Sequence, residues 1–148
     1  MTISNKKTSS LFILACCVML MGSACAEEKS KSFTEAGVYW THYSSTKDAD
    51  HFLALSSINT MKSGTVRFWE LVNRHKPYYG ALSDKSLAEA ECDTHGIKRI
   101  QTTGYSKQNG VGETIAFNPM DENPYYPPPG TSGATLIDMV CYIARTKN

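Results

Sequence analysis

The strongest strand pattern covers residues 65–73, which read Thr-Val-Arg-Phe-Trp-Glu-Leu-Val-Asn and carry apolar side chains at both odd and even positions. In an extended chain both faces of this segment carry large apolar side chains, with Val66, Phe68 and Val72 on one face and Arg67, Trp69 and Leu71 on the other. β-Branched and aromatic residues suit a pleated surface, and a strand that is apolar on both faces belongs inside a sheet. The pattern therefore predicts a central β-strand that ends before Pro77.

Further segments have the alternation or the composition typical of strands. They are residues 38–43, 51–55, 83–92, 96–106 and 113–117. Turn signals separate several of these segments, among them Ser63-Gly64 and Asn109-Gly110. Short connections of this kind favour antiparallel pairing of consecutive strands. Between the central strand and residue 83, the segment 73–82 is expected to be a loop.

Two segments allow both a helix and a strand. In residues 83–92 good helix formers occupy a segment that also alternates, and we favour the strand. Residues 131–145 have apolar side chains at helical spacing and also at alternate positions. Thr131-Ser132 is a plausible helix start after a run of prolines, so we favour a helix. The fold class predicted is α+β, with a six-stranded antiparallel sheet flanked by a C-terminal helix.

The first 26 residues have the pattern of a secretory signal peptide: two lysines, a short apolar run and small residues before an acidic pair. Cleavage after Ala26 is the favoured interpretation. In the alternative, Cys25 becomes the lipid-modified first residue of a lipoprotein, and the lipid would tether the domain to a membrane.

The remaining chain is long enough for one compact domain. We expect a disordered tether over residues 27–36, because this segment is polar and without periodicity, and a single domain over residues 37–148. The signal contains two of the 15 basic residues and none of the 14 acidic ones, so thirteen basic residues face fourteen acidic residues after cleavage. A net charge near −1 does not favour nucleic acid or an anionic membrane as a partner.

Three of the five cysteines lie within the signal segment. Cys92 and Cys141 remain, and an even pair in an exported chain favours one disulfide bond, with two free buried thiols as the alternative. Two cysteines alone cannot supply four zinc ligands. The histidines have no spacing typical of metal ligands; they are His42, His51, His75 and His95. We therefore expect no metal and no cofactor.

Catalytic motifs are not apparent in the sequence. No serine stands in a Gly-x-Ser-x-Gly turn, no glycine-rich loop precedes a phosphate-binding lysine, and no catalytic pair of acids can be chosen. Candidate residues for a partner surface are an arginine of the central strand and two tyrosine pairs in proline-bounded loops, namely Arg67, Tyr78, Tyr79, Tyr125 and Tyr126. For Arg67 an ion pair with Glu70, Glu89 or Glu91 across the sheet is the favoured alternative.

Several residues also occur in an order that is similar to a known family. The ordered set is Trp40, Trp69, Glu91-Cys92-Asp93, Arg99, Tyr105, Pro129-Gly130-Thr131 and Cys141. This order resembles the surface-adhesin protein E family of Gram-negative bacteria. The resemblance implies a small antiparallel sheet with a C-terminal helix and one disulfide, an envelope location, and binding of host extracellular-matrix and plasma proteins.

On this basis we expect a non-enzymatic, exported binding protein with a protein partner, in the periplasm or at the outer membrane or cell surface. Membrane contact is expected only if Cys25 is lipidated. The alternatives are a periplasmic structural or housekeeping module and a small secreted hydrolase, and a homodimer stays open.

Overall fold

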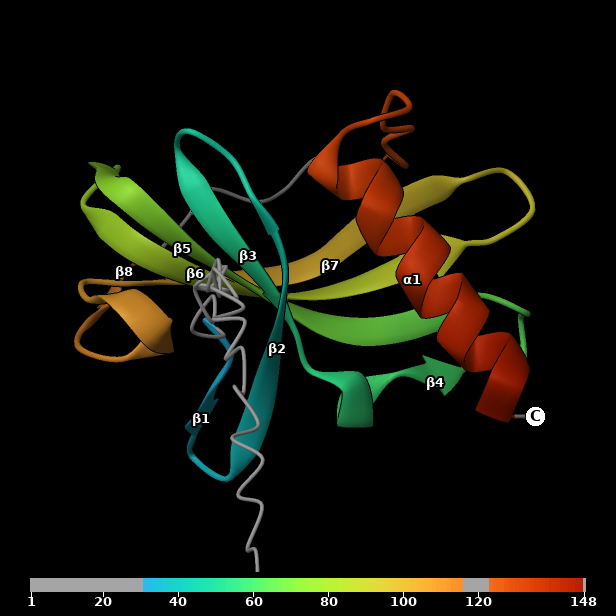
Figure 1. The fold of residues 1–148 in the computed structure, drawn as a ribbon, viewed down its shortest axis with the longest axis horizontal. Helices are drawn as coiled ribbons and strands as arrows, with labels where there is room; N and C mark the ends of the chain where they lie inside the picture. The colour runs from blue at the N-terminus through green and yellow to red at the C-terminus, as the bar shows by residue number, and fades with distance from the viewer. Residues whose placement is uncertain (1–30, 116–122, 148) are drawn as a thin grey trace, which may run out of the picture.

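The computed structural model describes residues 31–115 and 123–147. Within these residues it contains eight β-strands and one α-helix (Figure 1). The strands are β1 (Phe33–Glu35), β2 (Val38–Ser45), β3 (Ala49–Leu53), β4 (Asn59–Thr60), β5 (Val66–Tyr78), β6 (Ala81–Glu91), β7 (Gly96–Tyr105) and β8 (Thr114–Ile115). Helix α1 runs over Ser132–Lys147, and two short 3-10 turns lie at Leu55–Ser57 and Gln108–Gly110.

The strands form one antiparallel sheet in the order β1-β2-β3-β5-β6-β7-β8. Strand β4 lies beyond β3 on the same edge of β5: Leu53 of β3 pairs with Glu70, and Asn59 of β4 pairs with Arg67. Strand β5 thus has neighbours on both sides, as predicted from its two apolar faces.

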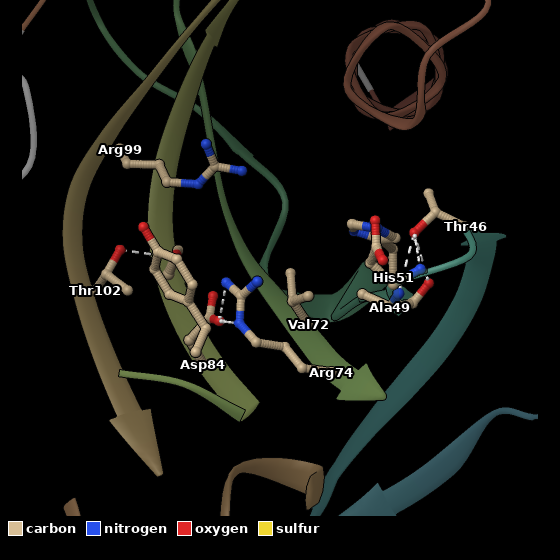
Figure 2. A pocket seen from close by; sticks show the side chains of 11 residues that line it. Thr46, Ala49, His51, Val72, Arg74, Asp84, Arg99 and Thr102 are labelled. Carbon is tan, nitrogen blue, oxygen red and sulfur yellow. Dashed lines mark hydrogen bonds and ion pairs between the residues drawn. The ribbon is translucent and has the colours of Figure 1, made fainter. Parts of the chain in front are cut away.

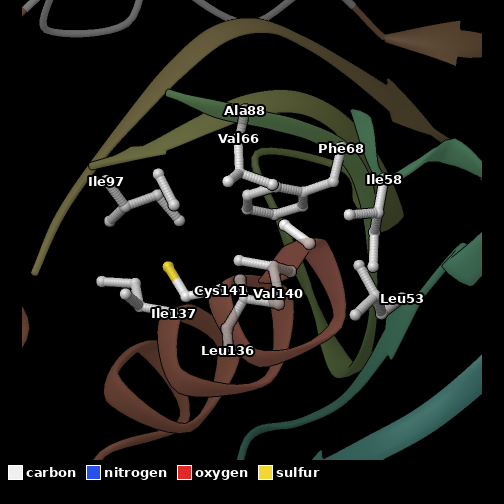
Figure 3. Packing of buried hydrophobic residues seen from close by; sticks show 12 residues of the cluster. Leu53, Ile58, Val66, Phe68, Ala88, Ile97, Leu136, Ile137, Val140 and Cys141 are labelled. Atoms are coloured by element: carbon white, nitrogen blue, oxygen red, sulfur yellow. The ribbon is translucent and has the colours of Figure 1, made fainter. Parts of the chain in front are cut away.

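Helix α1 packs across one face of the sheet and forms the main hydrophobic core (Figure 3). On the sheet side, Val66 and Phe68 of β5 are almost fully buried. On the helix side the buried residues are Leu136, Ile137, Val140, Cys141 and Ala144. Their spacing of three and four residues is the apolar stripe expected of a helix that covers a sheet.

A disulfide bond joins Cys92, just after β6, to Cys141 in α1, with 5.7 Å between the Cα atoms. This confirms the predicted pairing, and it links two residues that are 49 positions apart in the sequence.

The opposite face of the sheet carries a second, smaller core. Trp40, Phe52, Ala54 and Leu71 are buried there, and Trp69 packs against them. Leu71 and Trp69 belong to the face of β5 that points away from α1. Both faces of β5 therefore bury large apolar side chains, which is the physical reason for its unusual sequence.

The structure corrects the predicted strand count and the extent of the loop over residues 73–82. Strands β5 and β6 continue into that loop, and Tyr79 and Gly80 close them into a tight hairpin with φ values of 47° and 82°. Positive φ at both central residues is typical of the turns that match the twist of hairpins. Pro77 is tolerated because the β5–β6 pairing is interrupted between Asn73 and Tyr78.

Residues 33–35 were expected to lie in a disordered tether, but they form β1 and pair with β2. Three residues are too few for a visible alternation, so this strand has no recognisable pattern in the sequence. The favoured predictions for the two ambiguous segments are confirmed. Residues 83–92 belong mostly to strand β6, and residues 131–145 mostly to helix α1.

The signal segment, Cys25, and residues 116–117 of the last predicted strand lie outside the described residues. In the described part of the chain, α1 does not have the length and apolar character of a membrane-crossing helix.

Candidate functional site

A polar pocket lies on the same face of the sheet as α1, beyond the end of the hydrophobic core (Figure 2). Its volume is about 410 Å³. The face of β5 that supplies Val66 and Phe68 to the core continues with Glu70, Val72 and Arg74, because alternate residues of a strand point the same way. Neighbouring strands add His51 from β3, Asp84 from β6, and Arg99 and Thr102 from β7.

A buried carboxylate separates the core from the pocket. Glu70 is 2% exposed. Its Oε1 accepts a hydrogen bond of 2.8 Å from the hydroxyl of Tyr43, and its Oε2 accepts one of 3.0 Å from Nη2 of Arg99. Nδ1 of His51 lies 3.7 Å from Oε1, which is too long for a hydrogen bond.

These neighbours keep Glu70 ionised. Burial opposes its charge, but the contacts with His51, Arg99 and Tyr43 outweigh burial and lower its pKa to about 2. The pKa of Tyr43 is raised, first by its own burial and then by the charge of Glu70. The charge of Glu70 also raises the pKa of Arg99. At neutral pH the cluster is therefore an ion pair supported by a neutral phenol.

A second ion pair lines the pocket. Nε and Nη2 of Arg74 both donate to Oδ2 of Asp84, at 2.9 and 2.6 Å. The guanidinium of Arg74 also lies over the ring of Tyr78, 4.9 Å from its centroid. Burial raises the pKa of Asp84, and Arg74 acts in the opposite direction. The arginine is thus held between a carboxylate and an aromatic ring.

The charged side chains of the pocket are better suited to ion pairing than to proton transfer. A carboxylate whose pKa is about 2 is a weak base at neutral pH, whereas efficient general bases have pKa values nearer to the working pH. In residues 31–115 and 123–147 no three His, Cys, Asp or Glu side chains come together as a metal site. What the pocket offers is a set of fixed charges and hydrogen-bond donors around a small volume.

The candidate surface residues lie apart from one another. Arg67 projects on the opposite face and forms an ion pair with Glu89, with 2.6 Å between Nη2 and Oε1. This is the cross-strand pairing favoured from the sequence. Tyr78 and Tyr79 are exposed at the β5–β6 turn, with ring centroids 4.5 Å apart.

Tyr125 and Tyr126 are also exposed, but Tyr125 pairs with Ile97 at the start of β7. Ile97 faces Ala90 of β6, and Ala90 faces Val66 at the start of β5. Since Tyr78 is the last residue of β5 and Tyr79 follows it, the two tyrosine pairs lie at opposite ends of the long β5–β6 ladder. They do not form one surface.

Sequence reasoning did not find the pocket. The available signal was a charged residue at an inward position of β5, where Glu70 stands between Phe68 and Val72. An inward charge in a central strand requires a buried partner. Identifying Arg99 as that partner required the strand order, because β6 lies between the two residues.

Comparison with known proteins places the chain in a family. A family model described as surface-adhesin protein E matches residues 40–142. The chain belongs to the surface-adhesin protein E family. The resemblance noted from the ordered residues is thereby confirmed. A search of curated proteins found no match.

Solved structures of Haemophilus influenzae protein E share the fold of this family member. The selenomethionine form has a TM-score of 0.59 at 16% identity, covering 76% of this chain and 92% of that chain. A further structure of the same protein gives 0.58 at 15% identity, covering 76% and 90%. Crystal form II gives 0.53 at 16% identity, covering 67% and 91%. At 15–16% sequence identity, these matches establish a shared fold only.

Proposed function

We propose that this protein is an exported, non-enzymatic binding protein of the bacterial envelope that recognises host extracellular-matrix or plasma proteins. Membership of the surface-adhesin protein E family carries this proposal. A disulfide-closed domain fits it as well, because disulfides persist in the oxidising compartments outside the cytoplasm.

We assign partner binding to the surface at the β5–β6 turn. Tyr78 and Tyr79 are 51% and 78% exposed, and their rings meet edge to face. Arg74 lies over the ring of Tyr78 and limits its freedom. Aromatic side chains that are already ordered lose little conformational entropy on binding, and tyrosine is frequent among the residues that dominate interface energies.

Binding to immobilised laminin and vitronectin tests the proposal. The purified mature domain should give a saturable signal on at least one of these surfaces. The paired variant Y78A/Y79A should weaken that signal, while Y125A/Y126A, at the other end of the sheet, serves as the matched control. A lack of saturable binding by the unaltered domain counts against the function, and equal loss in both variants counts against the assigned surface.

Export and surface location need their own test. We propose cleavage after Ala26 and exposure at the cell surface. The mass of the mature protein distinguishes this cleavage from a lipid-modified Cys25, and protease treatment of intact cells reports exposure. Full protection from external protease would favour a periplasmic module instead.

A further inference from the structure

We propose that the polar pocket between β3 and β7 is a binding site for a carboxylate group, with Arg74 and Arg99 as its principal donors. Tyr78 lines this pocket and also belongs to the tyrosine surface. Carboxylate binding is nevertheless measured without any matrix protein, so the proposal does not depend on the adhesive function. The carboxylate could belong to a small organic acid or to an acidic side chain of a protein. Both sources present the same chemistry to the pocket.

Both arginines have N–H groups that make no hydrogen bond within the described residues. Arg99 donates to Glu70 through Nη2, and among the described residues neither its Nε nor its Nη1 has a hydrogen-bond partner. Arg74 donates to Asp84 through Nε and Nη2, which leaves its Nη1 without a partner in the same part of the chain. A guanidinium carries five N–H donors in a planar fork that matches the two oxygens of a carboxylate.

The two guanidiniums are oriented before any ligand arrives. Glu70 holds Arg99, while Asp84 and the ring of Tyr78 hold Arg74. Both acids are buried, so they bind the arginines from within the sheet. Figure 2 shows Arg99 and Arg74 on strands to either side of Asp84. Receptors with fixed donors lose less entropy on binding than flexible ones do.

The surroundings strengthen such an interaction. The side chains of Arg74 and Arg99 are 28% and 32% exposed, so water solvates them only in part. Charge-assisted hydrogen bonds are stronger in such partly desolvated sites than in open water. The volume of about 410 Å³ is sufficient for a small ligand. His51 lies across the pocket from Arg99 (Figure 2), and within residues 31–115 and 123–147 its Nδ1 has no hydrogen-bond partner.

A cation is a weaker candidate for this pocket. Glu70 and Asp84 already form ion pairs with Arg99 and Arg74. The two arginines would repel a metal ion or an ammonium group. The charges of these two ion pairs balance, and Asp48 adds a further carboxylate to the pocket lining. An added carboxylate must therefore be held by directed hydrogen bonds rather than by excess positive charge. That requirement favours a carboxylate, whose two oxygens can meet two N–H groups at once.

The test is to titrate each probe compound into the purified mature domain. Binding is monitored through the NMR chemical shifts of the backbone amides. The free-acid arm uses succinate against its neutral diamide, succinamide. The protein-borne arm uses Ac-Ala-Glu-Ala-NH₂ against Ac-Ala-Gln-Ala-NH₂. Saturable shifts around the pocket with succinate or with the glutamate peptide, and not with the matched neutral compound, support the site and indicate which source it accepts.

Variants make the assignment specific. Arg74→Gln should weaken binding about tenfold or more, as expected for the loss of one charge-assisted hydrogen-bonding group. Arg67→Gln is the matched control, because it removes the same charge from the other face of β5 and should change binding less than about twofold. Arg99→Lys keeps the charge opposite Glu70 while losing the planar fork, and should also weaken binding.

Three results would overturn the proposal. They are the absence of saturable shifts with both acidic probes, equal shifts with the neutral compounds, and equal weakening by Arg67→Gln and Arg74→Gln. An amide spectrum recorded for each variant verifies that it is folded before its affinity is compared.

Discussion

Removal of the disulfide should lower the free energy of unfolding without altering the folded structure. The change is the double variant C92A/C141A. The bond joins residues 49 positions apart, and a loop of this size stabilises the folded state by about 4 kcal/mol in the chain-entropy model. The effect arises in the unfolded chain, which becomes more extended and more disordered once the link is absent.

The helix should remain docked in this variant. Leu136, Ile137 and Val140 are at most 1% exposed. Each buried aliphatic side chain contributes roughly 1.5–3 kcal/mol, so the three together exceed the contribution of the bond. The far-ultraviolet circular dichroism spectrum without denaturant should therefore match that of the unaltered protein.

Urea unfolding measures the difference. Small domains have urea m-values of ~1–3 kcal/mol/M, so the midpoint should fall by about 2 M. The unaltered protein unfolded in the presence of a reductant is the control, and its midpoint should fall similarly. A decrease below about 0.5 M would refute the loop-entropy reasoning, and a loss of helical signal before urea is added would refute the claim that apolar packing holds α1.

Three other substitutions probe the sheet. Phe68→Ala removes a fully buried ring and should cost about 3–5 kcal/mol of unfolding free energy in urea titrations. Glu70 has a folded-state pKa of about 2 against an ordinary 4.5, so its contribution is present above pH 4.5 and is lost as the pH falls towards 2. Glu70→Gln should accordingly flatten the loss of unfolding free energy between pH 5 and pH 3; an unchanged slope would contradict this. Arg67→Ala breaks a half-exposed ion pair with Glu89 and should cost less than about 1 kcal/mol in the same titrations.

Segments with a strong local pattern could be predicted from the sequence. The two apolar faces of residues 65–73 identified the central strand, and the cysteine count identified the disulfide. The end of β5 could not be placed, because Pro77 signals a break in pairing but not the resumption of pairing at Tyr78. Strand β1 was missed because it depends on the Ala36-Gly37 turn, where both φ values are positive, and alanine rarely adopts that conformation.

The pocket could not be predicted for a different reason. Its members come from four strands and from the turn between β2 and β3. The two members of each ion pair are also separated in the sequence: Arg99 is 29 residues from Glu70, and Arg74 is 10 residues from Asp84. Local patterns report which face of a strand a residue occupies. They do not report which residue of a non-adjacent strand shares that face, because this depends on strand order and register.

The lengths of the elements explain why a polar pocket forms at this place. Helix α1 has 16 residues and is about 24 Å long, at 1.5 Å per residue. Strand β5 has 13 residues and extends for about 43 Å, at 3.3 Å per residue. The helix therefore cannot cover the whole face of β5, and the uncovered part must be compatible with water. Paired charges on β5 to β7 meet that need, because Asp84 and Glu70 are each bound by an arginine. Structural necessity accounts for the ion pairs, but it does not require guanidinium donors to remain free, and these free donors are the feature that favours a ligand.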